Sequence, residues 1–234
     1  MPIEKKPGVS PAFIAGLTLC CWLYLLGGSG TGMSAWSMST MHFPPHETFP
    51  QMSVQWGPGY VMLMLAMWFT MMLGMMLPAL MLQAYSEQEK WSPPTRFLWE
   101  YALVWLCASL AAVALQLSLE KFGMLDGMRM WSVNSVLSYS LLGLAGLSQL
   151  WWLLVPKRLL EKTAPEIGSS GYRYGLSCLK ATAPIMLLLF VGGVMNIYWI
   201  SALTVWVIVL KMWPLSRLRP SVTIMICFFL ALLV

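Results

Sequence analysis

The stretch "GYVMLMLAMWFTMMLGMMLPALML", residues Gly59 to Leu82, decides the fold class of this 234-residue chain. A helix that crosses the hydrocarbon core of a bilayer needs about 20 predominantly apolar residues. This stretch is longer than that and contains no charged side chain. It therefore predicts a transmembrane helix near residues 58–83.

Similar apolar segments lie on both sides of this stretch, and they predict about six helices. They lie near residues 11–28, 58–83, 97–119, 132–155, 177–193 and 196–213, and a tail at 221–234 is too short to span. The composition agrees, because 59% of the residues are hydrophobic and 10% are charged, against about 25% charged residues in soluble domains. We predict one all-α domain over residues 1–234, a polytopic helix bundle in a membrane.

The basic residues indicate how the helices are oriented, because loops rich in Lys and Arg stay in the cytoplasm. With the N-terminus in the cytoplasm, 12 of the 14 Lys and Arg residues lie inside, and only Lys121 and Arg129 lie outside. The sequence therefore predicts a multi-pass protein of the bacterial cytoplasmic (inner) membrane, with residues 29–57 as an extracytoplasmic loop. The net charge of +5 needs no nucleic acid partner, since anionic lipid headgroups account for it.

The predicted outer loop contains the stretch "SGTGMSAWSMSTMHFPPHETFP", residues Ser29 to Pro50. Both histidines of the chain lie there, together with three methionines and an acidic residue. Thioether sulfur is a soft ligand that suits Cu(I), and imidazole suits copper as well as zinc. We predict an extracytoplasmic copper site with the candidate ligands Met33, Met38, Met41, His42, His46 and Glu47. The alternative is a loop whose side chains rest at the headgroup boundary without a metal.

The second predicted helix is rich in methionine, with eight such residues between Met62 and Met81. Four of them follow one another at helical spacing and share a face: Met64, Met67, Met71 and Met75. Such a row can be a thioether path for a soft cation, or adaptable packing that fills irregular gaps. We interpret the deeper methionines as packing, and add only Met62 and Met64, at the outer end, to the candidate copper ligands.

Two stretches, "MWFTMMLGMMLP" (Met67 to Pro78) and "GLSCLKATAPIMLLLFVGGVMNIYWI" (Gly175 to Ile200), resemble a bacterial family of predicted metal-binding integral membrane proteins. The family is a domain of unknown function, and the resemblance covers most of the chain. It implies a helical membrane protein that binds a metal. This chain resembles a divergent member, because it lacks cysteines and an acidic residue that the family carries: Ala181, Thr182 and Ala183 follow Cys178, and Leu210 precedes Lys211.

Three classes of function remain open from the sequence. The chain is an extracytoplasmic copper-binding protein that acts in copper handling or in assembly of a membrane complex, a subunit of a copper-dependent membrane oxidoreductase of the monooxygenase type, or a structural membrane subunit. We rank the first highest. The sequence carries no catalytic motif of its own and no Gly-rich phosphate loop, so no nucleotide partner is expected. The expected partners are the lipid bilayer and other membrane subunits.

Overall fold

A computed structural model describes residues 9–29, 57–87, 93–125, 135–154 and 170–212. These residues form helices and no strand, which confirms the predicted all-α class. The helices are α1 (Pro11–Leu26), α3 (Pro58–Glu87), α4 (Thr95–Lys121), α5 (Ser135–Leu154), α7 (Gly171–Met186), α8 (Leu189–Gly192) and α9 (Ile197–Met212).

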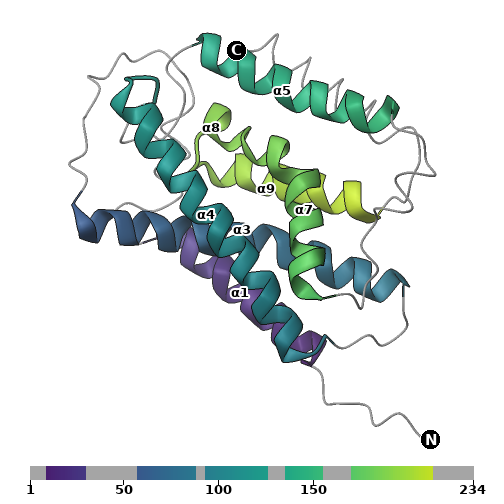
Figure 1. Cartoon of the computed structure of the whole chain (residues 1–234). Coiled ribbons are helices and arrows are strands. Elements are labelled where there is room, and N and C mark those ends of the chain that lie inside the picture. The colour runs from purple at the N-terminus through teal and green to yellow at the C-terminus, as the bar shows by residue number, and fades with distance from the viewer. Residues whose placement is uncertain (1–8, 30–56, 88–92, 126–134, 155–169, 213–234) are drawn as a thin grey trace, which may run out of the picture.

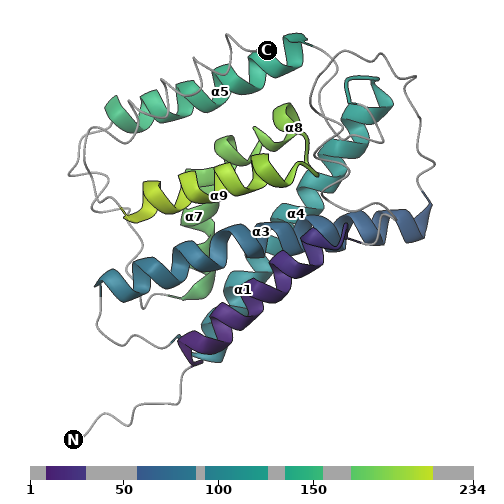
Figure 2. The ribbon, with the colours of Figure 1, turned by 180° about the vertical axis from the view of Figure 1, so that it is seen from behind.

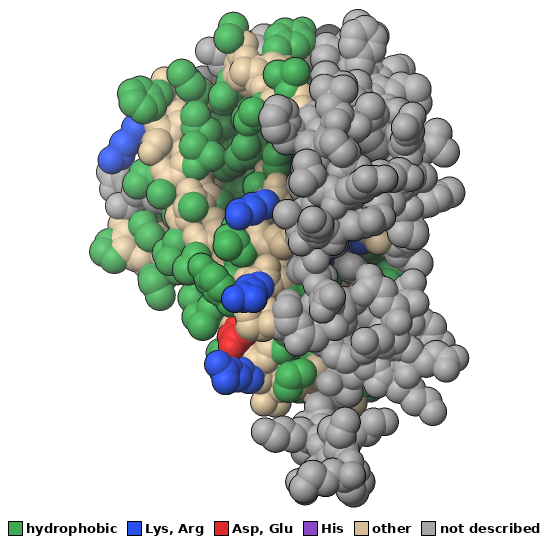
Figure 3. Space-filling model, turned by 45° about the vertical axis from the view of Figure 1, so that its right-hand side comes forward, with side chains coloured by type: hydrophobic (Ala, Val, Ile, Leu, Met, Phe, Trp, Pro, Cys, Tyr) green, Lys and Arg blue, Asp and Glu red, His purple; other side chains and the backbone are tan. Residues whose placement is uncertain are grey.

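Three helical segments are long and apolar enough to cross a membrane: Pro58–Leu82, Thr95–Lys121 and Gly171–Gly192. Helices α1, α5 and α9 contribute shorter apolar stretches. Hydrophobic side chains also cover much of the described outer surface, as Figure 3 shows for one face. Among those that are exposed, Phe13, Trp99 and Val205 have more than half of their surface free. The number of spans beyond three remains a prediction.

Helix α3 lies at the centre of the arrangement, because it packs against α1, α4 and α9. Helix α7 packs along α4 and also touches α5 and α9. Figures 1 and 2, which view the chain from opposite sides, both place α5 and α1 on opposite sides of the other helices. The hydrophobic core forms around α3, with buried side chains from α1, α4, α5, α7, α8 and α9.

The contact between α1 and α3 depends on a proline inside α3. Pro78 has no N–H group, so the carbonyl group of Gly74, one turn earlier, loses its helical hydrogen bond. The indole Nε1 of Trp22 on α1 donates to this carbonyl oxygen at 3.2 Å. Since Gly74 has no side chain, Cys21 and Trp22 can approach its backbone closely. A neighbouring helix thus satisfies the freed acceptor, as is common where proline interrupts helices in membranes.

The contact between α4 and α7 depends on two glycines one turn apart. A Cβ atom at Gly171 would meet the backbone carbonyl of Phe97, and one at Gly175 would lie 3.1 Å from the Val104 Cβ. Small residues at this spacing let helix backbones approach, as in membrane helix pairs. The close approach lets Tyr174 pack into the aromatic side chains of α4, with its ring 5.7 Å from that of Phe97.

The fifth predicted helix, 177–193, differs from the observed structure. Helix α7 begins earlier, at Gly171, where the Ser170 hydroxyl accepts a hydrogen bond from the Arg173 N–H (3.4 Å). Serine at this position satisfies a backbone donor of the first turn. The helix then stops at Met186, shortly after Pro184, and only the short helix α8 follows before α9. The predicted single helix is therefore two helices with a break between them.

The first turns of α1, α4 and α7 lie near one another. The N–H of Val9, just before α1, donates to the carbonyl oxygen of Pro93, just before α4 (2.9 Å). Glu100 on α4 accepts from Arg96 (2.8 Å) and from the N–H of Tyr172 in α7 (3.4 Å). The charge-based topology predicts that all three of these helix starts face the cytoplasm. Their proximity places them at one end of the helices, and the side of a membrane that this end faces stays a prediction.

Candidate metal site

The predicted outer-loop ligands Met33, Met38, Met41, His42, His46 and Glu47 lie outside the described residues. The other two candidates, Met62 and Met64, lie in the first two turns of α3. Met62 is 66% exposed, whereas Met64 is fully buried. The side chains of these two methionines therefore lie in different surroundings, and the structure does not bring them together.

Five of the deeper methionines of α3 are buried, and Met81 is half-buried. Met67, Met71, Met72, Met75 and Met76 each have at most 4% of their surface exposed. The predicted common face is therefore turned into the core, together with the positions that flank it. Burial agrees with a packing role, but it also removes these sulfur atoms from water.

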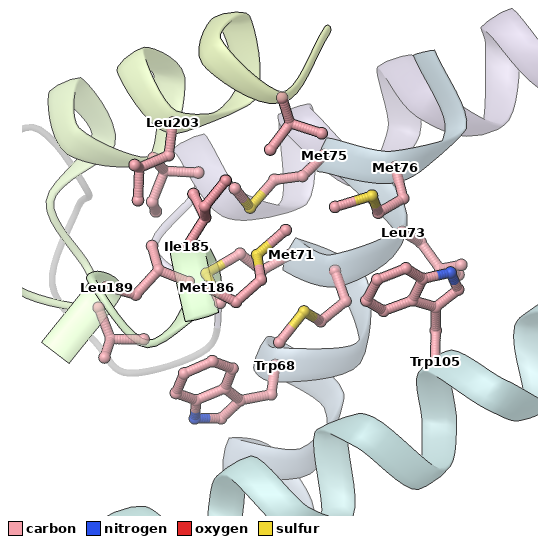
Figure 4. Close-up of a cluster of buried hydrophobic side chains, with 14 of the residues drawn as sticks. Trp68, Met71, Leu73, Met75, Met76, Trp105, Ile185, Met186, Leu189 and Leu203 are labelled. Carbon is pink, nitrogen blue, oxygen red and sulfur yellow. The ribbon is translucent and has the colours of Figure 1, made fainter. Parts of the chain in front are cut away.

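Three of the buried thioethers lie together. Figure 4 shows the sulfur atoms of Met71, Met75 and Met186 in one group between α3 and the end of α7. We call these three residues the thioether cluster. Met76 lies apart from the group, on the side of Leu73 and Trp105. The methionine spacing along α3 gave no indication of Met186, although this residue lies inside the stretch that carries the family resemblance.

The surroundings of the thioether cluster are apolar. Ile185, Leu189 and Leu203 lie beside it in Figure 4, and each is at least 93% buried. Trp68 lies on another side of the thioether cluster, and its ring is 5.3 Å from that of Phe190. A soft, neutral set of sulfur atoms is thus held in a site of low polarity.

The position of Met186 is fixed by the turn between α7 and α9. Trp199 of α9 donates from its indole Nε1 to the carbonyl oxygen of Leu188 at 2.9 Å. Asn196 accepts from the N–H groups of Tyr198 and Trp199 at 3.1 and 3.3 Å, and so caps the start of α9. These contacts hold the chain directly after Met186 against the first turn of α9.

A second sulfur-containing contact joins the middle of α7 to the end of α9. Lys211 donates from Nζ to the Sγ atom of the buried Cys178 at 3.0 Å, and its ammonium group lies 5.7 Å from the centre of the Tyr174 ring. Both Cys178 and Lys211 match residue types of the family resemblance. The thiol is already a hydrogen-bond acceptor, and no group of three or more His, Cys, Asp or Glu side chains that could hold a metal occurs among the described residues.

The thioether cluster is therefore the best candidate metal site within the described helices. Thioethers are neutral and soft, which favours Cu(I) over zinc or magnesium. Neutral ligands also need no deprotonation before they bind a metal.

The copper chaperone family PpoB2 matches residues 65–234. This region includes most of α3, all three residues of the thioether cluster, and the Cys178–Lys211 contact. No curated protein and no solved structure matches the chain.

Proposed function

This chain belongs to the PpoB2 copper chaperone family, and we propose that it is a chaperone embedded in a membrane that takes up Cu(I) on the extracytoplasmic side and passes it to a partner membrane protein. The family match over residues 65–234 carries the proposal. The matched region includes the methionine-rich helix α3, whose thioether groups are suitable ligands for Cu(I).

The membrane location is supported by the length and apolar character of the three candidate spans. It is also supported by the exposed apolar side chains on the outer surface of these helices. Large apolar patches on a soluble monomer would favour aggregation, whereas lipid solvates them. The charge distribution favours a cytoplasmic N-terminus, which places residues 29–57 outside.

This orientation can be tested by labelling. In a variant whose five native cysteines are replaced by serine, we expect the Ser39→Cys substitution to react with a membrane-impermeant maleimide on intact cells. The Ser169→Cys substitution should react only after the cells are permeabilised, because its loop is rich in Lys and Arg. The reverse pattern would contradict both the orientation and the proposed uptake face.

Uptake is assigned to the outer loop and to the start of α3. The candidate ligands are Met33, Met38, Met41, His42, His46, Glu47 and Met62, whereas Met64, the other candidate from the sequence, is buried away from this surface. Methionine and histidine in one segment give a soft and a borderline ligand type, which together suit copper during capture. The exposed side chain of Met62 extends this set to the surface of α3.

The assignment predicts that a variant with His42→Ala, His46→Ala, Met38→Leu and Met41→Leu binds copper at least about 10-fold more weakly, since even the loss of outer-shell partners costs ~10–100-fold in metal affinity. The two methionine changes alone should weaken Cu(I) more than zinc. Competition with chromophoric chelators measures both affinities on the purified full chain.

The control for the outer-loop variant is Met52→Leu, which removes a methionine that we do not assign as a ligand from the same segment. We expect it to bind Cu(I) as the unchanged chain does. Unaltered copper binding in the four-residue variant would contradict the proposed uptake site.

A further inference from the structure

We propose that the thioether cluster, Met71 and Met75 of α3 with Met186 of α7, is a second Cu(I) site, buried between the helices. This proposal rests on the proposed function, because it adds an internal site to a chain that handles copper. It differs from the proposed uptake site in location, in ligand type and in its expected response to pH.

The arrangement of the three sulfur atoms carries the proposal. Met71 and Met75 are one helical turn apart, so their side chains lie on the same face of α3. Met186 comes from another helix, and its sulfur atom lies with theirs in Figure 4. From the spacing on α3 alone, packing is the simpler interpretation. Figure 4 shows a third thioether, from the last residue of α7, turned toward these two, and three thioethers are ligands of the type that a soft cation prefers.

The apolar surroundings of the thioether cluster favour an ion of low charge. Met71 and Met75 are fully buried and Met186 is 4% exposed, so a bound ion loses nearly all of its water. The desolvation penalty rises steeply with ionic charge, and an unpaired charge in an apolar site is costly. A monovalent ion with soft ligands is therefore favoured over Cu(II) or zinc, which have two charges and prefer harder or anionic ligands.

The flexibility of methionine suits a site that must release its ion. The side chain has three rotatable bonds and a polarisable sulfur atom, so it can turn toward a passing ion without movement of the helix backbone. Because two helices supply the ligands, a bound ion would also link α3 to α7. Cu(I) should therefore raise the temperature of unfolding of the protein.

The test uses the full chain in detergent, loaded anaerobically with Cu(I). The variant Met71→Leu, Met75→Leu, Met186→Leu keeps side-chain volume, and such swaps usually cost less than about 1.5 kcal/mol in stability. We expect it to lose one Cu(I) equivalent per chain, as measured by chelator competition, together with the sulfur-only coordination shell seen by X-ray absorption. The remaining thermal shift on addition of Cu(I) should be smaller than in the unchanged chain.

The matched control is Met76→Leu, which removes another fully buried methionine of the same helix that lies outside the cluster. It should retain the full Cu(I) equivalent. The affinity of the cluster should also be unchanged between about pH 6 and pH 8, since thioethers do not titrate, whereas the histidine loop, with an ordinary His pKa of about 6.5, should weaken at the lower pH. If the triple variant is unstable, Met186→Leu alone should still lower the affinity.

The outcomes separate this proposal from the proposed function. If the triple variant binds as much Cu(I) as the unchanged chain, with the same coordination shell, the methionines are packing and the inference is overturned. If the outer-loop variant alone loses all copper, the proposed function stands and the buried site does not. If the unchanged chain binds no Cu(I), the proposed function itself is wrong.

Discussion

Replacing Gly192 by alanine is expected to lower the stability of the folded protein strongly. A Cβ atom at this position would overlap the indole ring of Trp199. The ring cannot move away without breaking its hydrogen bond to the Leu188 carbonyl oxygen (2.9 Å). Overpacking of this kind costs about 1–3 kcal/mol or more, and a buried acceptor left without a donor costs about 1–3 kcal/mol. Their sum is a large part of the ~5–15 kcal/mol that holds most domains folded.

The measurement for Gly192→Ala is the yield of monodisperse protein and its temperature of unfolding in detergent. Gly143→Ala in α5 is the matched control, because nothing lies within 4 Å of a Cβ atom there. We expect the control to behave as the unchanged chain does. Equal stability of the two variants would show that the turn after α7 is not held by Trp199. Because this turn follows Met186, its loss should also disturb the thioether cluster.

The sequence was sufficient to predict the helices that consist of one uninterrupted apolar run. The segments 11–28 and 196–213 agree with α1 and α9 to within two residues at each end, because the apolar runs begin and end where the helices do. The break after α7 could not be predicted in the same way. Pro184 precedes it, but the surrounding run is apolar, and the contact of Trp199 with Leu188 that holds the broken segment forms only when α9 folds back.

The candidate site was predicted in part for a similar reason. Helical spacing correctly placed Met71 and Met75 on one face, since that relation is local in the chain. It could not supply Met186, because the approach of α7 to α3 is a tertiary contact between distant segments. The outer-loop ligands are also a local pattern, and they stay a prediction because they lie outside the described residues.

The family resemblance marked Cys178 and Lys211 in the sequence, but it did not predict that the two side chains are in contact. The two residues lie on different helices, α7 and α9, and the resemblance gave no reason to expect these helices to bring them close in space. The structure brings them to 3.0 Å, with Tyr174 beside them. The residues that replace the family's other cysteines, such as Ala181, offer no further sulfur near this thiol. This part of α7 is therefore better explained as a packing contact than as a metal site.

Replacing Gly171 by alanine is expected to separate the first turns of α7 and α4. A Cβ atom at Gly171 would meet the carbonyl group of Phe97, and backbone in a helix cannot turn aside as a side chain can. Gly175→Ala should have a smaller effect, because its nearest neighbour is the side chain of Val104 at 3.1 Å. Overpacking against a fixed neighbour costs about 1–3 kcal/mol or more, so Gly171→Ala should lower the temperature of unfolding more than Gly175→Ala does.

Reactivity of Cys178 gives a second readout for the same pair of variants. Its side chain is 6% exposed because α4 and α9 cover this part of α7. Separation of α7 from α4 should let a small maleimide reach the thiol, so we expect Gly171→Ala to increase the labelling rate of Cys178 and Gly143→Ala to leave it unchanged. Labelling at the rate of the unchanged chain, together with an unchanged temperature of unfolding, would mean that α4 and α7 tolerate a side chain at their closest point. The close packing of Gly171 and Gly175 against α4 would then not be what positions α7 and Met186.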